Sequence, residues 1–124
     1  MSATAARVIH RALPGFEHIN RYWDPQRDAM AAKILPGEFY VTLMDEFVLT
    51  TLGSCVAACI WDRELGIGGV NHFMLPGTRE AGDTDFARAP EAARYGVFAM
   101  EQLINTILKH GGRRSKLLVK IAGG

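Results

Sequence analysis

The sequence lacks the features that mark several specialised classes of protein. Its two cysteines are too few for the disulfide framework that holds small secreted domains together. Lysine plus arginine number 14 against 13 aspartates plus glutamates, so the basic surplus typical of a nucleic-acid-binding protein is missing. The longest uninterrupted apolar run, Cys55 to Trp61, is far shorter than the roughly 20 residues that cross a bilayer. The first residues contain no apolar stretch of the kind found in a signal peptide. We therefore expect a soluble cytoplasmic protein that neither binds nucleic acid nor inserts into a membrane.

What remains is an ordinary globular composition, with 48% apolar and 22% charged residues in 124. This length fits one domain with a core of its own. Residues 1–35 contain two turn signals, at Pro14-Gly15 and at Asp24-Pro25, and their apolar residues are scattered. We predict that residues 1–35 form an irregular leader, with at most a short helical turn over Asp28 to Ile34. The folded domain is predicted to span residues 36–124.

From Glu38 onward the pattern is that of β-strands. Apolar and polar residues alternate after Glu38, and β-branched or apolar stretches follow at 47–52, 67–75 and 117–122. The run from Cys55 to Trp61 has apolar residues on both faces, which is typical of a central strand buried on both sides. A short buried helix fits this run nearly as well.

One long helix is predicted after a polar loop over Thr78 to Pro90. Apolar residues follow at spacings of three or four, and Gly111-Gly112 ends the pattern after a basic last turn. The stripe consists of Ala93, Val97, Met100, Ile104 and Ile107. Because short turns join most of the strands, we expect antiparallel pairing and an α+β fold.

The segment Gly53-Ser54-Cys55 is the first candidate for chemistry. Small residues before a cysteine allow a sharp backbone turn whose amides stay exposed, and such amides can stabilise an oxyanion beside a nucleophile. The alternative is that Cys55 only begins a buried strand, as most lone cysteines do. Cys59, inside the apolar run, is expected to be an inert buried thiol.

His72 is the second candidate. It lies in an apolar strand, where the imidazole needs hydrogen-bond partners, so a core histidine bonded to a carbonyl is one interpretation. The other is that a tight turn brings His72 beside Cys55, which is the minimum arrangement for an activated thiolate. Either Thr50 or Thr51 can orient the imidazole, but not both, since neighbouring residues of a strand point to opposite faces. A zinc site is a poor alternative for Cys55, Cys59 and His72, because the C-x3-C spacing is looser than in typical structural zinc sites and no fourth ligand is evident. We expect neither a metal nor a cofactor.

Several motifs resemble the CheD family of chemoreceptor glutamine deamidases. The two longest are 51–59 (TLGSCVAAC) and 68–76 (GGVNHFMLP). Three shorter matches are 35–42 (LPGEFYVT), 94–96 (RYG) and 120–124 (KIAGG). The resemblance implies the cysteine hydrolase fold shared with deamidating toxins, in which layered β-sheets are flanked by helices. It also implies that Cys55 is the nucleophile, that His72 is the general base, and that a threonine completes the site. Thr50 fits that third position better than its neighbour Thr51.

The implied activity is hydrolysis of glutamine side-chain amides, and of glutamate methyl esters, on the cytoplasmic signalling helices of chemoreceptors. Some members of the family also bind a CheC-type phosphatase. Members usually continue beyond the final Gly123-Gly124 into further strands, so we expect residues 36–124 to be a C-terminally truncated CheD-like domain. The alternative function is a non-catalytic module that docks on chemoreceptors or on a CheC-type phosphatase.

Overall fold

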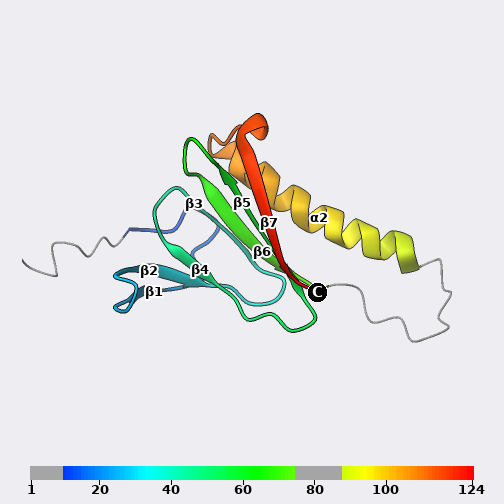
Figure 1. Ribbon diagram of the computed structural model, residues 1–124, viewed down its shortest axis with the longest axis horizontal. Helices are drawn as coiled ribbons and strands as arrows, with labels where there is room; N and C mark the ends of the chain where they lie inside the picture. Colours follow the sequence, from blue (N-terminus) through cyan, green and yellow to red (C-terminus); the bar gives the residue numbers. More distant parts are fainter. Residues whose placement is uncertain (1–9, 75–87) are drawn as a thin grey trace, which may run out of the picture.

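The computed structural model describes residues 10–74 and 88–124, with side chains from residue 96 onward in the second range. Within these residues, two β-sheets form two layers and a long helix lies against the larger sheet (Figure 1). The smaller sheet has the strand order β1-β2-β4 and the larger has β3-β6-β5-β7. The elements are β1 (Asn20–Asp24), β2 (Ala29–Lys33), β3 (Phe39–Thr42), β4 (Phe47–Leu49), β5 (Val56–Asp62), β6 (Gly68–Phe73), α2 (Arg88–Lys109), η1 (Arg114–Lys116) and β7 (Leu117–Gly123).

The larger sheet is antiparallel throughout, but among its neighbouring strands only β5 and β6 are joined by a short turn. Strands β3 and β4, which a short turn also joins, lie in different sheets, so the expected antiparallel pairing of these two strands is wrong. Strand β5 lies between β6 and β7, so the apolar run that begins at Cys55 is a central strand and not a helix. Its residues Ala58 and Ile60 are fully buried, because every second side chain of β5 points to the layer of α2. The predicted α+β class is confirmed, and β2 with β4 is the one parallel pair among the described strands.

Helix α2 covers one face of the larger sheet, on β3, β5 and β6. Its described contacts with the core come from Ala99, Met100, Leu103, Ile104 and Ile107. Leu103 and Ile107 are fully buried. Val97 was expected in this stripe but is 54% exposed, because the apolar residues that reach the core begin only at Ala99. The helix ends as predicted. Gly111 adopts a φ of +104°, and the last turn closes with hydrogen bonds from the N–H groups of residues 111 and 112.

The predicted irregular leader is wrong for residues 20–33, which form the antiparallel hairpin β1–β2. Asp24-Pro25, interpreted as a break, lies at the hairpin turn, where the Asp24 carboxylate accepts hydrogen bonds from the next backbone N–H groups. The predicted helical turn over Asp28 to Ile34 is also wrong. The small apolar residues of β2 are buried between β1 and β4, and this pairing outweighs the helix propensity of alanine. The predicted loop at 78–90 lies mostly outside the described residues.

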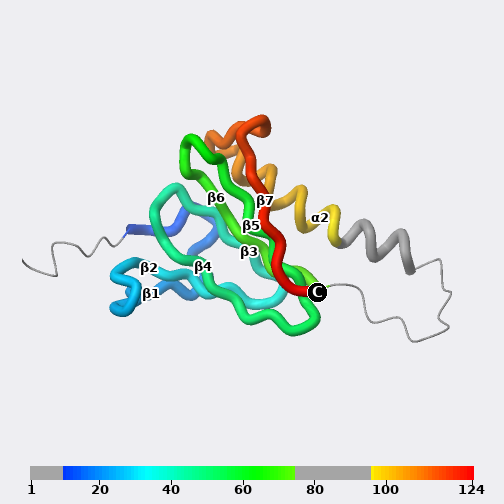
Figure 2. The backbone as a smooth tube through the Cα atoms, viewed as in Figure 1, coloured from blue at the N-terminus to red at the C-terminus, as the bar shows by residue number. Residues whose placement is uncertain are grey.

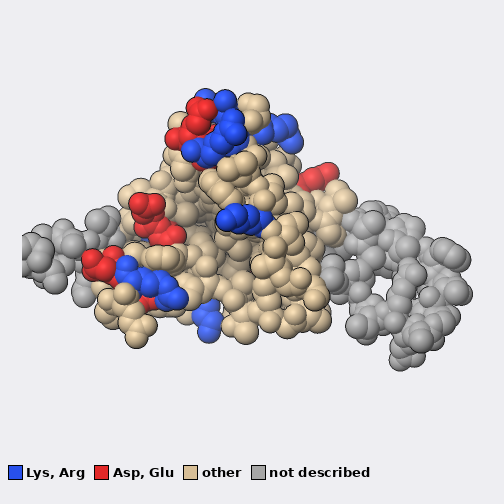
Figure 3. Space-filling model, viewed as in Figure 1, with Lys and Arg blue, Asp and Glu red and all other residues tan. Residues whose placement is uncertain are grey.

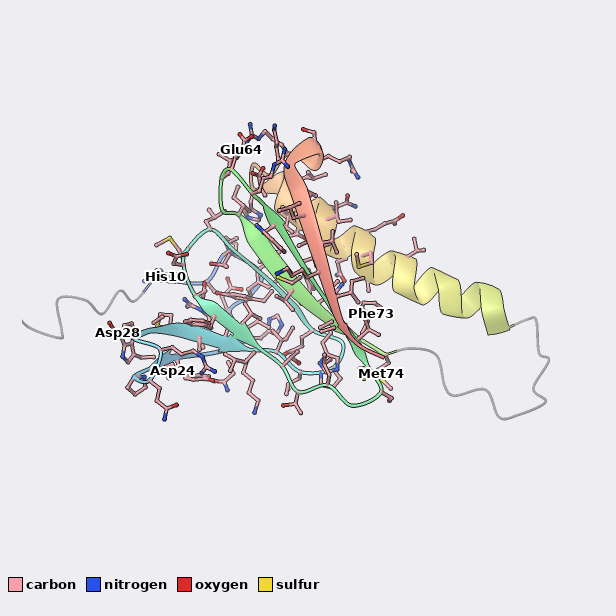
Figure 4. The ribbon with its side chains drawn as sticks, viewed as in Figure 1. His10, Asp24, Asp28, Glu64, Phe73 and Met74 are labelled. Carbon is pink, nitrogen blue, oxygen red and sulfur yellow. The ribbon has the colours of Figure 1, made fainter. Side chains whose placement is uncertain are left out.

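A buried carboxylate connects the two layers ahead of β4. Glu46 accepts hydrogen bonds from the hydroxyls of Tyr40 and Thr42 on β3, and its Oε1 lies 3.5 Å from Nε of Arg21 on β1. Burial, and then the hydrogen bond to Glu46, raise the pKa of the Tyr40 hydroxyl. His10, labelled in Figure 4, lies 3.8 Å from the same carboxylate. This cluster fixes the start of β4, and therefore the segment that follows β4.

Charged side chains gather at the end of the larger sheet that carries the β5–β6 turn and η1 (Figure 3). Arg113 lies 2.9 Å from Glu64 and also contacts the buried Asp62, while Lys116 lies 3.0 Å from Glu64. Figure 4 labels Glu64 at this end and Phe73 at the other. Arg113 and Lys116 are thus paired with acidic side chains at this edge.

Candidate active site

The candidate site begins with a hydrogen-bonded chain that joins both sheets. His72 lies near the end of β6 and is only 2% exposed. Its Nδ1 lies 2.6 Å from Oγ1 of Thr50, just beyond β4. The same hydroxyl donates to the carbonyl oxygen of Ile34, just beyond β2, at 2.9 Å. Thr51 is exposed and takes no part in these hydrogen bonds. The structure therefore brings Thr50, and not its neighbour, against the imidazole.

These two hydrogen bonds place the proton of the imidazole on one of its nitrogens. A threonine hydroxyl has a single hydrogen, and the Ile34 carbonyl can only accept it. The Thr50 oxygen must then accept from Nδ1–H of His72, which leaves Nε2 as the nitrogen with a lone pair. Nε2 is buried and has no hydrogen-bond partner in the described part of the chain. A buried basic nitrogen without a partner is the atom that a general base presents to an acidic proton.

Cys55 lies immediately before β5, the strand that pairs with the strand of His72. Ala57 stands directly opposite His72 across the β5–β6 ladder, and Cys55 precedes Ala57 by two residues. If the extended backbone of β5 continues back to Cys55, alternation would place its side chain on the face of Ala57, diagonal to the imidazole. The Cys55 side chain is half-buried, and the described structure contains no hydrogen bond between it and His72. Catalytic contacts of this kind often form only when substrate binds.

The two residues before Cys55 form an exposed bend after β4. Among the described residues, the amide N–H groups of Gly53 and Ser54 donate no hydrogen bond. They lie beside the candidate nucleophile and remain available to an external acceptor. A carbonyl oxygen that gains negative charge is the acceptor such amides stabilise best.

The second cysteine has different surroundings. Cys59 lies inside β5 opposite Lys120 of β7, and burial raises the pKa of its thiol. A raised pKa keeps the sulfur protonated and unreactive. Among the side chains that the structure describes, those of residues 10–74 and 96–124, no group of three or more His, Cys, Asp or Glu comes together to hold a metal ion.

The carbonyl of Ile34 is the member of this site that the sequence did not predict. A backbone oxygen is present at every residue, so composition and spacing carry no signal for it. Only the packing of β2 beside β4 places this carbonyl next to Thr50.

Comparison with known proteins finds similarity to one family. The family model for CheD chemotactic sensory transduction matches residues 74–124. A probable chemoreceptor glutamine deamidase CheD from Halorhodospira halophila is 60% identical over 119 residues, which cover 94% of this chain and 55% of that protein. Proteins of the same name from Hahella chejuensis and Saccharophagus degradans are each 50% identical, covering 91% and 100% of this chain and 53% and 57% of their own lengths.

The chain belongs to the CheD family. It spans about half the length of the curated CheD relatives that it matches. The matches to these relatives extend over nearly the whole chain, so they are not confined to the segment covered by the CheD family model. Among the described residues, no helix is long and apolar enough to span a membrane.

Proposed function

We propose that this chain carries the catalytic centre of a protein-glutamine deamidase that acts on the cytoplasmic helices of a chemoreceptor. The observation that supports it is the series of hydrogen bonds from the Ile34 carbonyl through Thr50 to His72, because it leaves a buried nitrogen with a free lone pair on the strand next to the one that Cys55 precedes. The substrate class comes from the relatives, which are named chemoreceptor glutamine deamidases. In this proposal Cys55 and His72 react, and Thr50 positions the imidazole of His72.

The reaction begins with transfer of the Cys55 thiol proton to Nε2 of His72. The thiolate attacks the carbonyl carbon of the glutamine side chain, and a C–S bond forms as the carbonyl oxygen becomes an oxyanion. The amide N–H groups of Gly53 and Ser54 hold this oxygen. Donors of this type contribute about 3–4 kcal/mol each in known hydrolases.

The tetrahedral intermediate then collapses and the C–N bond breaks. The imidazolium of His72 gives its proton to the departing nitrogen, so ammonia leaves and a glutamyl thioester remains on Cys55. The neutral imidazole next takes a proton from water, and the resulting hydroxide displaces the thiolate to release glutamate. A glutamate methyl ester follows the same path, with methanol as the leaving group.

Thr50 acts through His72. While Nδ1–H is bonded to the Thr50 oxygen, the other nitrogen stays basic and the ring keeps its orientation. The positive charge that His72 gains during the reaction is also stabilised, since an imidazolium donates from both nitrogens and Thr50 accepts one of these bonds.

The test is ammonia release from a purified receptor cytoplasmic fragment that carries glutamine at its modification sites. We expect release with the unchanged chain, almost none with Cys55→Ala or His72→Ala, and near-normal release with the matched variant Cys59→Ala. Normal release by Cys55→Ala would refute the cysteine mechanism. Binding to the receptor fragment, or to a CheC-type phosphatase, without any ammonia release would show that the domain is a docking module.

A further inference from the structure

We propose that Gly123 and Gly124 at the end of β7 are positioning residues that hold the backbone of the nucleophile Cys55. This inference rests on the proposed function, since it assigns these glycines a role in the reaction of that thiol. It is carried by a close backbone contact between the end of β7 and the residue just before β5. In Figure 2 the loop that follows β4 ends beside the C-terminal end of β7.

The contact leaves no space for a side chain on Gly123. A Cβ atom there would lie at clash distance from the carbonyl oxygen of Cys55, 3.4 Å from its carbonyl carbon and 3.2 Å from Cδ1 of Leu52. Gly123 also has a φ of +98°, in the region that other L-residues rarely adopt. The first of these distances is to backbone, which cannot swing aside as a flexible side chain does. Glycine is therefore required at position 123 for two independent reasons.

Gly124 forms a hydrogen bond in the same contact. Its N–H donates a hydrogen bond to the Cys55 carbonyl oxygen at 3.1 Å, and its own φ is +104°. Apart from hydrogen bonds within the strand ladders, this is the only backbone–backbone hydrogen bond of residues 51–55 among the described residues. The nucleophile thus lies at the end of an irregular loop that β7 holds at one carbonyl group.

This carbonyl carbon is bonded directly to the Cα atom that carries the thiol of Cys55. The carbonyl belongs to the peptide plane between Cys55 and Val56, and Val56 is paired with Gly123 across the β5–β7 ladder. Moving the oxygen would rotate that plane and change ψ of Cys55. A displacement of the whole carbonyl group would also shift the Cα atom of Cys55, and with it the thiol. A displacement of about 1 Å at a reacting atom can cost roughly 100-fold in rate.

The same contact leaves the opposite side of the bend open. Because the carbonyl of Cys55 is bonded to Gly124, the loop is held by its acceptor, and the donor groups of Gly53 and Ser54 are not used for that purpose. The end of β7 therefore orders the loop without occupying the amides proposed to bind the oxyanion.

Three alanine variants of the full chain separate steric displacement from backbone strain. Gly123→Ala brings both strain and the clash with Cys55. Gly124→Ala brings strain at the hydrogen-bond donor, but its Cβ meets nothing within 4 Å. Gly66→Ala is the matched remote control, since Gly66 has a φ of +77°, has nothing within 4 Å of its Cβ, and lies in the β5–β6 turn at the other end of the sheet.

Two readouts are taken for each variant. The first is the rate of iodoacetamide alkylation at Cys55 relative to Cys59 in the same molecule, resolved by peptide mass spectrometry. The second is the pair of kcat and KM for ammonia release from the receptor fragment. A general loss of structure exposes both thiols and raises alkylation of Cys59. Displacement of the nucleophile instead lowers the Cys55 rate alone and lowers kcat with little change in KM.

We expect Gly123→Ala to lower kcat and the Cys55 alkylation rate by about 10- to 100-fold. Gly124→Ala should lower both by a smaller factor, and Gly66→Ala should leave both close to the unchanged chain. Equal effects of Gly123→Ala and Gly66→Ala would overturn the inference. If Gly123→Ala does not fold, a Gly124→Ala variant with normal Cys55 reactivity would also overturn it. Absence of ammonia release by the unchanged chain refutes the deamidase proposal alone, because the alkylation ratio still reports on the position of Cys55.

Discussion

The replacement of Thr50 by valine tests the hydrogen-bonded chain most sharply. Valine has nearly the same shape as threonine, so the packing between the sheets is retained while the hydroxyl is lost. Two partners then lose their bond, the carbonyl of Ile34 and Nδ1–H of the buried His72. A buried polar group left without a partner costs about 1–3 kcal/mol. The imidazole can avoid the cost of an unpaired Nδ1–H by carrying its proton on Nε2 instead. In that tautomer Nε2 cannot accept the thiol proton.

An unpaired Nδ1–H and a change of tautomer both reduce turnover. A loss of about 1–3 kcal/mol in stabilisation of the reacting state corresponds to roughly a 5- to 150-fold decrease in kcat, since about 1.4 kcal/mol is a factor of ten. The assay is initial-rate ammonia release across pH, together with urea unfolding to measure the stability loss. Thr50→Ser is the matched control, because it keeps the oxygen and should retain most of the activity. A Thr50→Val variant with unchanged kcat would refute the assigned role of this hydroxyl.

Three further outcomes are expected. Iodoacetamide should modify Cys55 well before Cys59, whose thiol pKa is raised by burial, and faster labelling of Cys59 would contradict the assignment. Leu103→Ala should lower the free energy of unfolding by about 2–5 kcal/mol in denaturant titrations, since its side chain is fully buried, and a loss below about 0.5 kcal/mol would contradict the packing of α2. Hydrogen bonds from the backbone N–H groups of Leu65 and Arg113 lower the pKa of Asp62 from 3.8 to about 2, so its stabilisation is present above about pH 4 and is lost as the pH falls toward 2. Asp62→Asn should remove the contribution of Asp62 to the fall of the melting temperature at acid pH. An equally large fall in the variant would contradict this prediction.

The strands and the helix of residues 38–124 could be predicted because local sequence carries their signals. Alternation of apolar and polar residues marks β3, and Gly111 marks the end of α2. The central strand β5 was one of two interpretations, since a run that is apolar on both faces has no period. Its pairing with β6 and β7 decides between them.

The N-terminal hairpin could not be predicted, because alanine-rich β2 has weak strand propensity and becomes a strand only through its neighbours. Cys55 and His72 stood out by residue type and context. The choice between Thr50 and Thr51 depended on which side chain faces β6, and this follows from the three-dimensional packing of the two sheets. The contact of Gly123 with the Cys55 carbonyl joins residues far apart in sequence, and a Gly-Gly pair alone does not indicate what it touches.

The central claim is that Cys55 forms a covalent glutamyl thioester during turnover. The most direct measurement is acid quenching of the chain during turnover of a receptor fragment, followed by proteolysis and mass spectrometry of the peptide that contains Cys55. The account predicts a receptor-derived adduct on Cys55 that is absent from Cys55→Ala and that disappears when substrate is exhausted. Deamidation at a normal rate in Cys55→Ala, or an adduct found on Cys59 instead, would contradict it.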